Sequence, residues 1–177
     1  MINDILPWCK IYIATNGILL DKMNIEFFRF VNNNNVKIEI TKYPMKYNLS
    51  YILKDEKIFF IEDNVKKNFF KYKININGTN DSYVHAAICE RHGHCNILKD
   101  GKIYPCPIIA NVEYFNSFFN TNFKVTEEDY IDIYKENRKE KYLNVYFSNS
   151  PFCKYCNGIN REVVDWKISE RKIEEWA

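Results

Sequence analysis

The sequence predicts an α/β fold in two parts: βα units with a parallel sheet, followed by a small cysteine-rich α+β module. A strand, helix and strand pattern fills the first forty or so residues. Five of the six cysteines lie at position 89 or later, among short elements and turn residues. We place the boundary near residue 80, which gives predicted domains of residues 1–80 and 81–177.

The βα pattern begins with CKIYIA, residues 9–14, an apolar strand that ends at the turn TNG. In residues 18–35, Ile25, Phe28 and Val31 recur at helical spacing, and the run of asparagines ends the helix. The segment VKIEITKYP then predicts a second strand with alternate apolar residues on one face. A strand, helix and strand within so few residues predict parallel strands.

The pattern continues with a short predicted helix over residues 49–55 and two strands, over 57–63 and 69–78. Roughly three strands make a small open sheet with an unprotected edge. Such a sheet is incomplete as part of an eight-unit (β/α) barrel. The first domain therefore resembles a piece of a larger fold, such as a partial (β/α) barrel.

The second domain is predicted to contain two helices. Residues 125–140 form one, with Thr126 as N-cap and Asp129 at the capping-box position. A C-terminal helix begins at Ser169 and places Ile173 and Trp176 on one face.

Composition limits the function classes. The 177 residues are 46% hydrophobic and carry a formal net charge of +2 from 25 basic and 23 acidic residues mixed along the chain. No basic block indicates a nucleic-acid partner, no apolar run is long enough to span a membrane, and the start does not resemble a signal peptide. We expect a cytoplasmic protein that binds neither nucleic acid nor membrane.

The cysteines carry the chemistry. In a reducing compartment clustered thiols indicate metal or redox chemistry rather than disulfides. Cys153 and Cys156 form a C-x-x-C pair, whose spacing lets both sulfurs face one ion, and Cys106 follows a turn on Asp100-Gly101. Four thiolates are predicted to converge, the fourth coming from Cys95 or Cys89.

The residues alone leave the metal open. Four cysteines hold either structural zinc or a [4Fe-4S] cluster, and a metal-free thiol pair is a third alternative. His92 and His94 are either further ligands or loop histidines in solvent. Cys9, in an apolar stretch, is predicted to be a small buried side chain.

These motifs resemble the C-terminal part of radical SAM enzymes that carry an auxiliary iron-sulfur module of the SPASM or twitch type. That module has the pattern C-x(9–15)-G-x4-C followed later by C-x2-C. Cys89, Gly101 and Cys106 match its first part, with eleven and four intervening residues, and Cys153 with Cys156 matches the second. The segment IYIATNGILL is similar to a late barrel strand of such enzymes, and DWKISERKIEEW to the tails of one bacterial branch.

The resemblance implies a [4Fe-4S] cluster, with Cys106, Cys153, Cys156 and one of Cys89 or Cys95 as ligands. In the family such clusters relay electrons or hold substrate beside the S-adenosyl-L-methionine pocket. Thr15 and Asn16, at the carboxyl end of a predicted strand, would face that pocket, or would merely form a turn.

The C-x3-C-x2-C loop that holds the SAM-cleaving cluster is missing from these residues. The chain alone is thus not expected to start radical chemistry. We expect the second half of a truncated or split protein, whose partner is an N-terminal radical SAM half or an electron donor. The alternative is a zinc-stabilised structural or binding domain with no redox role.

Overall fold

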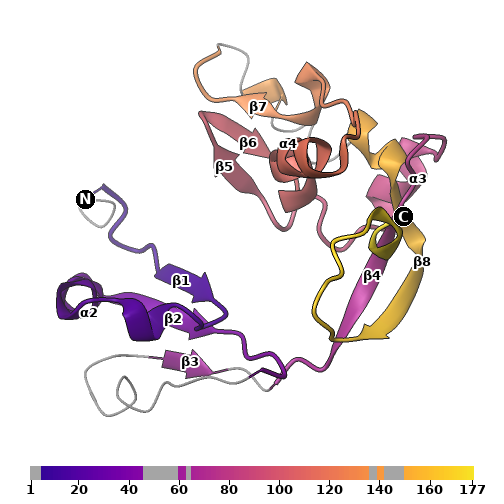
Figure 1. The fold of residues 1–177 in the computed structure, drawn as a ribbon. Coiled ribbons are helices and arrows are strands. Elements are labelled where there is room, and N and C mark those ends of the chain that lie inside the picture. The colour runs from indigo at the N-terminus through magenta and orange to yellow at the C-terminus, as the bar shows by residue number, and fades with distance from the viewer. Residues whose placement is uncertain (1–4, 46–59, 63–64, 136–138, 142–149) are drawn as a thin grey trace. The chain divides into compact units, whose positions relative to one another are not determined.

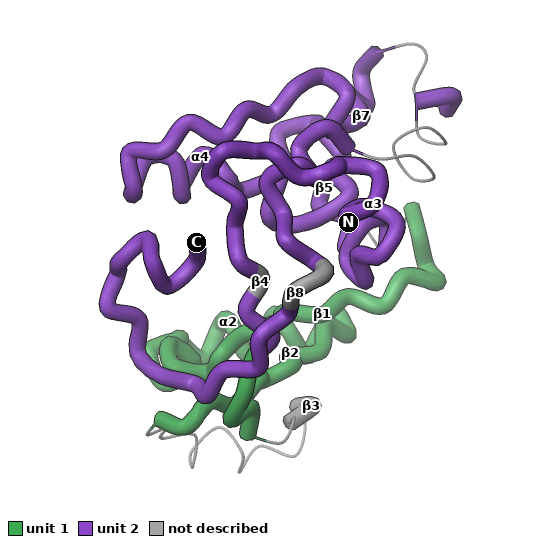
Figure 2. Tube along the Cα trace, turned by 90° about the vertical axis from the view of Figure 1, so that its right-hand side faces the viewer, with its two compact units in different colours: residues 1–69 green, residues 70–177 purple. Residues whose placement is uncertain are grey.

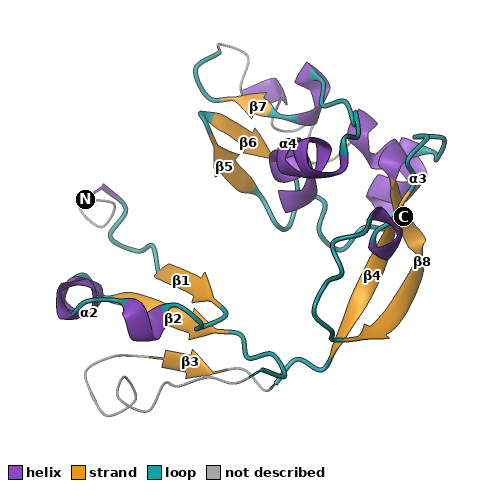
Figure 3. Cartoon of the chain, viewed as in Figure 1, coloured by secondary structure: helices purple, strands orange, loops and turns teal. Residues whose placement is uncertain are grey.

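The computed structural model describes residues 5–45, 60–62, 65–135, 139–141 and 150–177, and these form a mixed α/β protein with small separate sheets (Figures 1 and 3). The chain divides into two compact units, residues 1–69 and 70–177 (Figure 2). The division falls earlier than the residue 80 that the sequence predicted. In the described part, no helix has the length and apolar character needed to cross a membrane.

The described residues of the first unit form a three-stranded parallel sheet in the order β1-β2-β3 with one α-helix. Its elements are β1 (Ile11–Thr15), the 3-10 turn η1 (Leu20–Lys22), α2 (Ile25–Asn33), β2 (Val36–Ile40) and β3 (Phe60–Glu62). Ile11 pairs with Val36, and the register continues to Thr15 and Ile40. The predicted strand, helix and strand order and the parallel pairing are therefore confirmed.

The spacing of apolar residues explains how α2 packs on the sheet of this unit. The Asn24 side chain caps α2 by accepting a hydrogen bond from the Phe27 N–H at 2.9 Å. The helix then buries Phe28 and Val31 against alternate residues of β2, of which Ile38 and Ile40 have no exposed surface. This small core holds the helix on one face of the sheet.

The described strands of this unit form an open sheet and do not close into a barrel. The helix predicted over residues 49–55 lies outside the described residues. The partial barrel thus stays a prediction, while the mixed α/β class is shown.

The second unit contains two further sheets, β4 with β8 and β5-β6-β7. Its elements are β4 (Asn68–Ile74), α3 (Ser82–Ala87), β5 (Ile97–Lys99), β6 (Lys102–Tyr104), α4 (Pro107–Phe119), η2 (Glu127–Asp129), β7 (Ile131–Asp132), η3 (Pro151–Tyr155), β8 (Cys156–Asp165) and η4 (Ile173–Glu175). Its core joins α4 to η3 and the segment before η2, and includes Cys106, Ile109, Val112, Phe123, Phe152 and Tyr155.

The loop expected before Cys106 is a β-hairpin. Strands β5 and β6 pair antiparallel, with Ile97 opposite Tyr104. The two connecting residues, Asp100 and Gly101, both have positive φ, of 50° and 72°. Two-residue hairpin loops require this backbone, and Asp-Gly is one of the sequences that adopt it readily.

Over residues 125–135, the helix predicted for residues 125–140 is wrong. The capping box of Thr126 and Asp129 forms as expected, but it opens only the three-residue turn η2. Tyr130 is extended, and Ile131 pairs with Ile103 of β6. Tertiary pairing with β6 overrides the local helix signal, because Ile131 gains a buried position in the sheet.

The predicted C-terminal helix is also wrong. Only Ile173–Glu175 form a 3-10 turn, and Arg171 before it has a φ of 64°. The Glu175 carboxylate accepts hydrogen bonds from the Ser169 hydroxyl and from backbone N–H groups of the preceding loop. These bonds stabilise a tight loop in place of a helix.

Candidate metal centre

Four cysteines of the second unit come from separate elements. Cys89 follows α3, and Cys106 is the N-cap residue of α4. Cys153 lies in η3, and Cys156 begins β8. All six cysteines of the chain are free thiols.

Helix α3 brings the Cys89 segment to η3 and to the start of β8. The Asp81 carboxylate caps this helix by accepting hydrogen bonds from the Tyr83 and Val84 N–H groups. In the buried interior, the Gly158 N–H donates to Nδ1 of His85 at 3.2 Å. His85 therefore joins α3 to the backbone directly after the C-x-x-C pair.

Two further contacts fix the same segments. The Asn80 side chain donates to the carbonyl of Cys156 at 2.8 Å. On the other side of Cys89, the Glu90 carboxylate forms an ion pair with Arg161 of β8 at 2.7 Å. Both Cys89 and Cys156 thus lie in backbone that is tied to neighbouring elements.

A buried carboxylate positions η3. Asp129 has no exposed surface, and its Oδ1 accepts a hydrogen bond from the Phe152 N–H at 2.8 Å. Its Oδ2 accepts from the N–H and the hydroxyl of Thr126. Asp129 therefore holds the residue directly before Cys153.

The pKa values of these thiols depend on one another. Burial raises the pKa of Cys153 well above its ordinary value, and Cys156, Cys106 and Cys89 raise it further. Burial, followed by Cys106 and Cys89, raises the pKa of Cys156 to about 12. Since Coulomb interactions weaken with distance, such mutual effects place these thiols in one region of the second unit.

The surroundings of the Cys106 thiol have opposite effects on its pKa. Burial raises its pKa, while the N–H groups of Ile109 and Ile108, in the first turn of α4, lower it. The Arg91 guanidinium lowers the pKa of both Cys106 and Cys156. The centre thus combines apolar burial with positive potential, which suits thiolates once their protons are lost.

The remaining candidate residues lie differently. Cys95 is exposed, whereas Cys89 is half-buried and raises the pKa of Cys156. His94 is exposed, whereas His92 is half-buried and its ring Nε2 lies 3.4 Å from the Ser150 hydroxyl. Burial, with a smaller effect of His94, lowers the pKa of His92. Cys9 is exposed, so its predicted burial is wrong.

The four thiols form a loose group. Within the described ranges, no set of three or more His, Cys, Asp or Glu side chains is arranged so that it could hold a metal ion. A tetrahedral zinc site would place its sulfurs about 3.8 Å apart, given zinc–sulfur bonds of about 2.3 Å. Four thiols, of which Cys106 and Cys153 are buried, are still a donor set that fits a thiophilic metal, because each metal bond replaces a proton.

Thr15 and Asn16 form a turn in the first unit. The Thr15 hydroxyl accepts a hydrogen bond from the Gly17 N–H, and the Asn16 side-chain oxygen accepts one from the Ile18 N–H. Both residues are at the carboxyl end of β1, where the sequence placed them. Their predicted role toward a cofactor stays a prediction.

Sequence reasoning missed His85, Asp129 and Arg91 as residues of this centre. Arg91 lies two positions after Cys89, so the sequence does indicate a positive charge near that thiol. The roles of His85 and Asp129 depend on contacts that span 73 and 23 residues of sequence, respectively. No local pattern indicates such contacts.

No protein-family model matches this chain, and no curated protein matches it.

Proposed function

We propose that Cys89, Cys106, Cys153 and Cys156 bind a [4Fe-4S] cluster, and that the chain is the auxiliary-cluster portion of a radical SAM protein. The observation that carries this proposal is that four cysteines from separate elements of one unit influence one another's pKa values. Thiolates from four cysteines are the usual ligands of such clusters.

The order of the cysteines supports the same assignment. Cys89, Gly101 and Cys106, followed by the pair Cys153 and Cys156, match the SPASM or twitch pattern. Gly101 occupies a backbone position of positive φ in the hairpin that leads to Cys106. The pattern therefore includes a glycine where the fold needs one.

The parallel β1-β2-β3 sheet with α2 is proposed as the last units of a partial (β/α) barrel. In that arrangement Thr15 and Asn16 face the S-adenosyl-L-methionine pocket from the carboxyl end of β1. The cysteines of this chain match the pattern of the auxiliary cluster and not the C-x3-C-x2-C loop. In this proposal an N-terminal half or a partner holds the SAM-cleaving cluster. The free thiols suit the cytoplasm.

When bound, the cluster supplies a route for electrons or a site that holds substrate. The chain's own residues bury it and set its surroundings. Asp129 and His85 fix the backbone beside Cys153 and Cys156. The Arg91 guanidinium and the first-turn N–H groups of α4 add positive potential, which raises the reduction potential of an anionic centre.

Structural zinc is the second candidate, because the same four thiols are its donor set. It requires the sulfurs to contract to about 3.8 Å from one another. A zinc domain would have no redox role and would act as a structural or binding module.

Anaerobic reconstitution with iron and sulfide, in parallel with zinc loading, tests the proposal. The wild-type chain should become brown, absorb broadly in the visible range and contain about four irons per chain. The variants C106S, C153S and C156S should each lose most of this iron, because a cluster held by three thiolates instead of four is bound less tightly.

Matched controls use the remaining cysteines. C9S changes an exposed thiol of the other unit and should bind iron like the wild type. C95S should also retain iron, whereas C89S should lose it. A colourless protein with one zinc would reject the iron-sulfur proposal in favour of the zinc domain. If C153S and wild type contained the same amount of iron per chain, Cys153 would not be a ligand, which would reject both the iron-sulfur and the zinc site.

A further inference from the structure

The first unit has a pocket at the amino ends of β1 and β2, away from Thr15 and Asn16. Its volume is about 400 Å³, within the range of about 300–1,000 Å³ typical of small-molecule sites. It is lined by Pro7, Trp8, Cys9, Lys10, Ile11, Asn35 and Lys37. All these residues belong to one unit, so the pocket does not depend on how the two units are placed.

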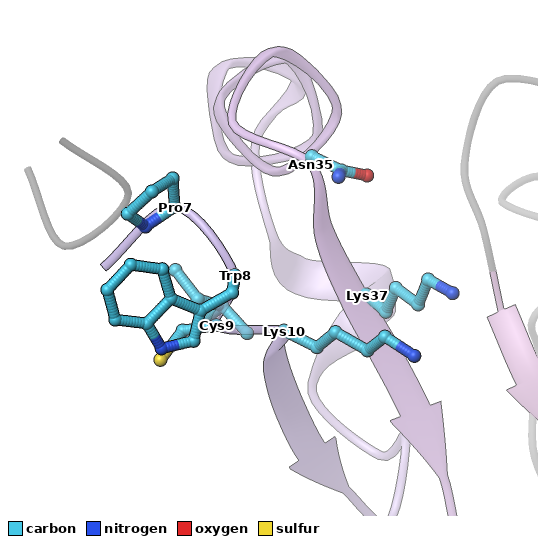
Figure 4. A pocket seen from close by; sticks show the side chains of 7 residues that line it. Pro7, Trp8, Cys9, Lys10, Asn35 and Lys37 are labelled. Atoms are coloured by element: carbon cyan, nitrogen blue, oxygen red, sulfur yellow. The ribbon is translucent and has the colours of Figure 1, made fainter. Parts of the chain in front are cut away.

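The pocket combines an aromatic ring with two cations. Trp8 is 75% exposed, which leaves most of its indole surface available for stacking. Figure 4 shows Trp8 at one side, while the side chains of Lys10 and Lys37 extend in the same direction at the other. Lys37 also lies over the Tyr12 ring, 6.0 Å from its centroid.

Among the residues that the structure describes, no carboxylate forms an ion pair with Lys10 or Lys37. Glu39 lies two residues after Lys37 on the same face of β2, and the carboxyl end of α2 is equivalent to roughly half a negative charge. The Phe30 carbonyl of that helix already accepts from the side chain of Asn34 at 2.8 Å. Among the residues that line the pocket, Lys10 and Lys37 are the charged ones, and both are positive.

We propose that this pocket binds a phosphorylated planar aromatic molecule, the class to which mononucleotides belong. The aromatic ring stacks on Trp8, and the phosphate lies between the ammonium groups of Lys10 and Lys37. Asn35 offers an amide to the polar part of the ligand. The inference does not depend on the metal centre, since that centre lies in the other unit.

The test uses adenosine 5′-monophosphate as the probe and alkylation of Cys9 by iodoacetamide as the readout. Cys9 is exposed and lines the pocket, so a bound ligand should slow its alkylation. Peptide mass spectrometry separates Cys9 from the other thiols. Protection should saturate with nucleotide, and adenosine or inorganic phosphate alone should protect much less, because each supplies only half of the contacts.

Variants identify the contacts. K10A and K37A should each weaken protection by the nucleotide about three- to tenfold, as expected for a partly exposed charged contact, and W8A should weaken it similarly. The matched control K22A changes a lysine of the same unit that does not line the pocket, and its affinity should equal that of wild type. Absence of saturable protection at millimolar nucleotide would overturn the proposal. Equal affinities in K37A, K22A and wild type would also overturn it.

Discussion

At the scale of single residues, buried polar groups explain how the metal centre is positioned. Asp129 is fully buried and accepts three hydrogen bonds, two of them from Thr126 and one from the Phe152 N–H. A carboxylate is buried in this way only where its hydrogen bonds are satisfied. Its bonds connect η2 to the segment that carries Cys153.

The variant D129A should lower the free energy of unfolding by about 3 kcal/mol, because three donors lose a buried acceptor. Urea denaturation measures this difference. Asp165 is an exposed residue of β8, so D165A serves as the control and should change stability by less than about 0.5 kcal/mol. Equal midpoints for D129A and D165A would contradict the assigned role of Asp129.

A second residue-scale prediction concerns acid. Hydrogen bonds from the Ser169 hydroxyl and from nearby backbone N–H groups lower the pKa of Glu175 from 4.5 to about 2. Since the folded-state pKa is the lower one, the ionised carboxylate stabilises the C-terminal loop above pH 4.5. That stabilisation should disappear as the pH falls from 4.5 to about 2.

An NMR titration of the Arg171 amide, which donates to Glu175, measures this transition. The midpoint should lie near pH 2 in wild type and in the control E174Q, and the transition should be absent in E175Q. A midpoint near 4.5 in wild type would show that the carboxylate is not held in the loop.

At the scale of elements, local patterns predicted the first unit well. Alternate apolar residues in β2 and helical spacing in α2 agree with the side chains that the structure buries. These signals are reliable because each element packs one face on one neighbour. The Asp100-Gly101 turn was likewise visible in the sequence, although the strands beside it were not predicted.

The second unit was harder to predict because long-range contacts decide its elements. Asp129 gave a true capping signal, but β6 pairing replaced the helix after one turn. The loop before Glu175 formed in place of a helix for a similar reason, since side-chain bonds satisfy its backbone. The cysteine pattern left Cys89 and Cys95 as alternatives, and the difference that the structure adds is that Cys89 is half-buried and Cys95 exposed.

Gly78 provides an element-scale test of the packing around η3. Its φ is 60°, and an added Cβ would lie 2.5 Å from Cε1 of the buried Tyr155. G78A should therefore lower the free energy of unfolding by about 2–4 kcal/mol, from backbone strain and overpacking together. G158A is the matched control, because an added Cβ there meets no atom within 4 Å. A similar loss in both variants would contradict the packing of Tyr155 on Gly78.

At the scale of the whole molecule, the two units have separate cores, and only the second contains the clustered thiols. Metal or cluster binding should stabilise the second unit selectively, because the bound centre joins α3, α4, η3 and β8. The stability of the first unit should not change when metal is bound or removed.

Hydrogen exchange measured by mass spectrometry, before and after anaerobic chelation, checks this selectivity. Peptides from residues 80–110 and 150–165 should lose protection, whereas peptides from residues 25–40 should not change. Equal loss in both units would mean that the chain unfolds as one body, and no loss anywhere would mean that metal does not stabilise it.

The most direct test of the central claim is a crystal structure of the anaerobically purified chain, measured at the iron and zinc absorption edges. We predict anomalous density from iron between the sulfurs of Cys89, Cys106, Cys153 and Cys156. Density at the zinc edge alone, or iron bound without Cys106 and Cys153, would contradict the proposed iron-sulfur centre.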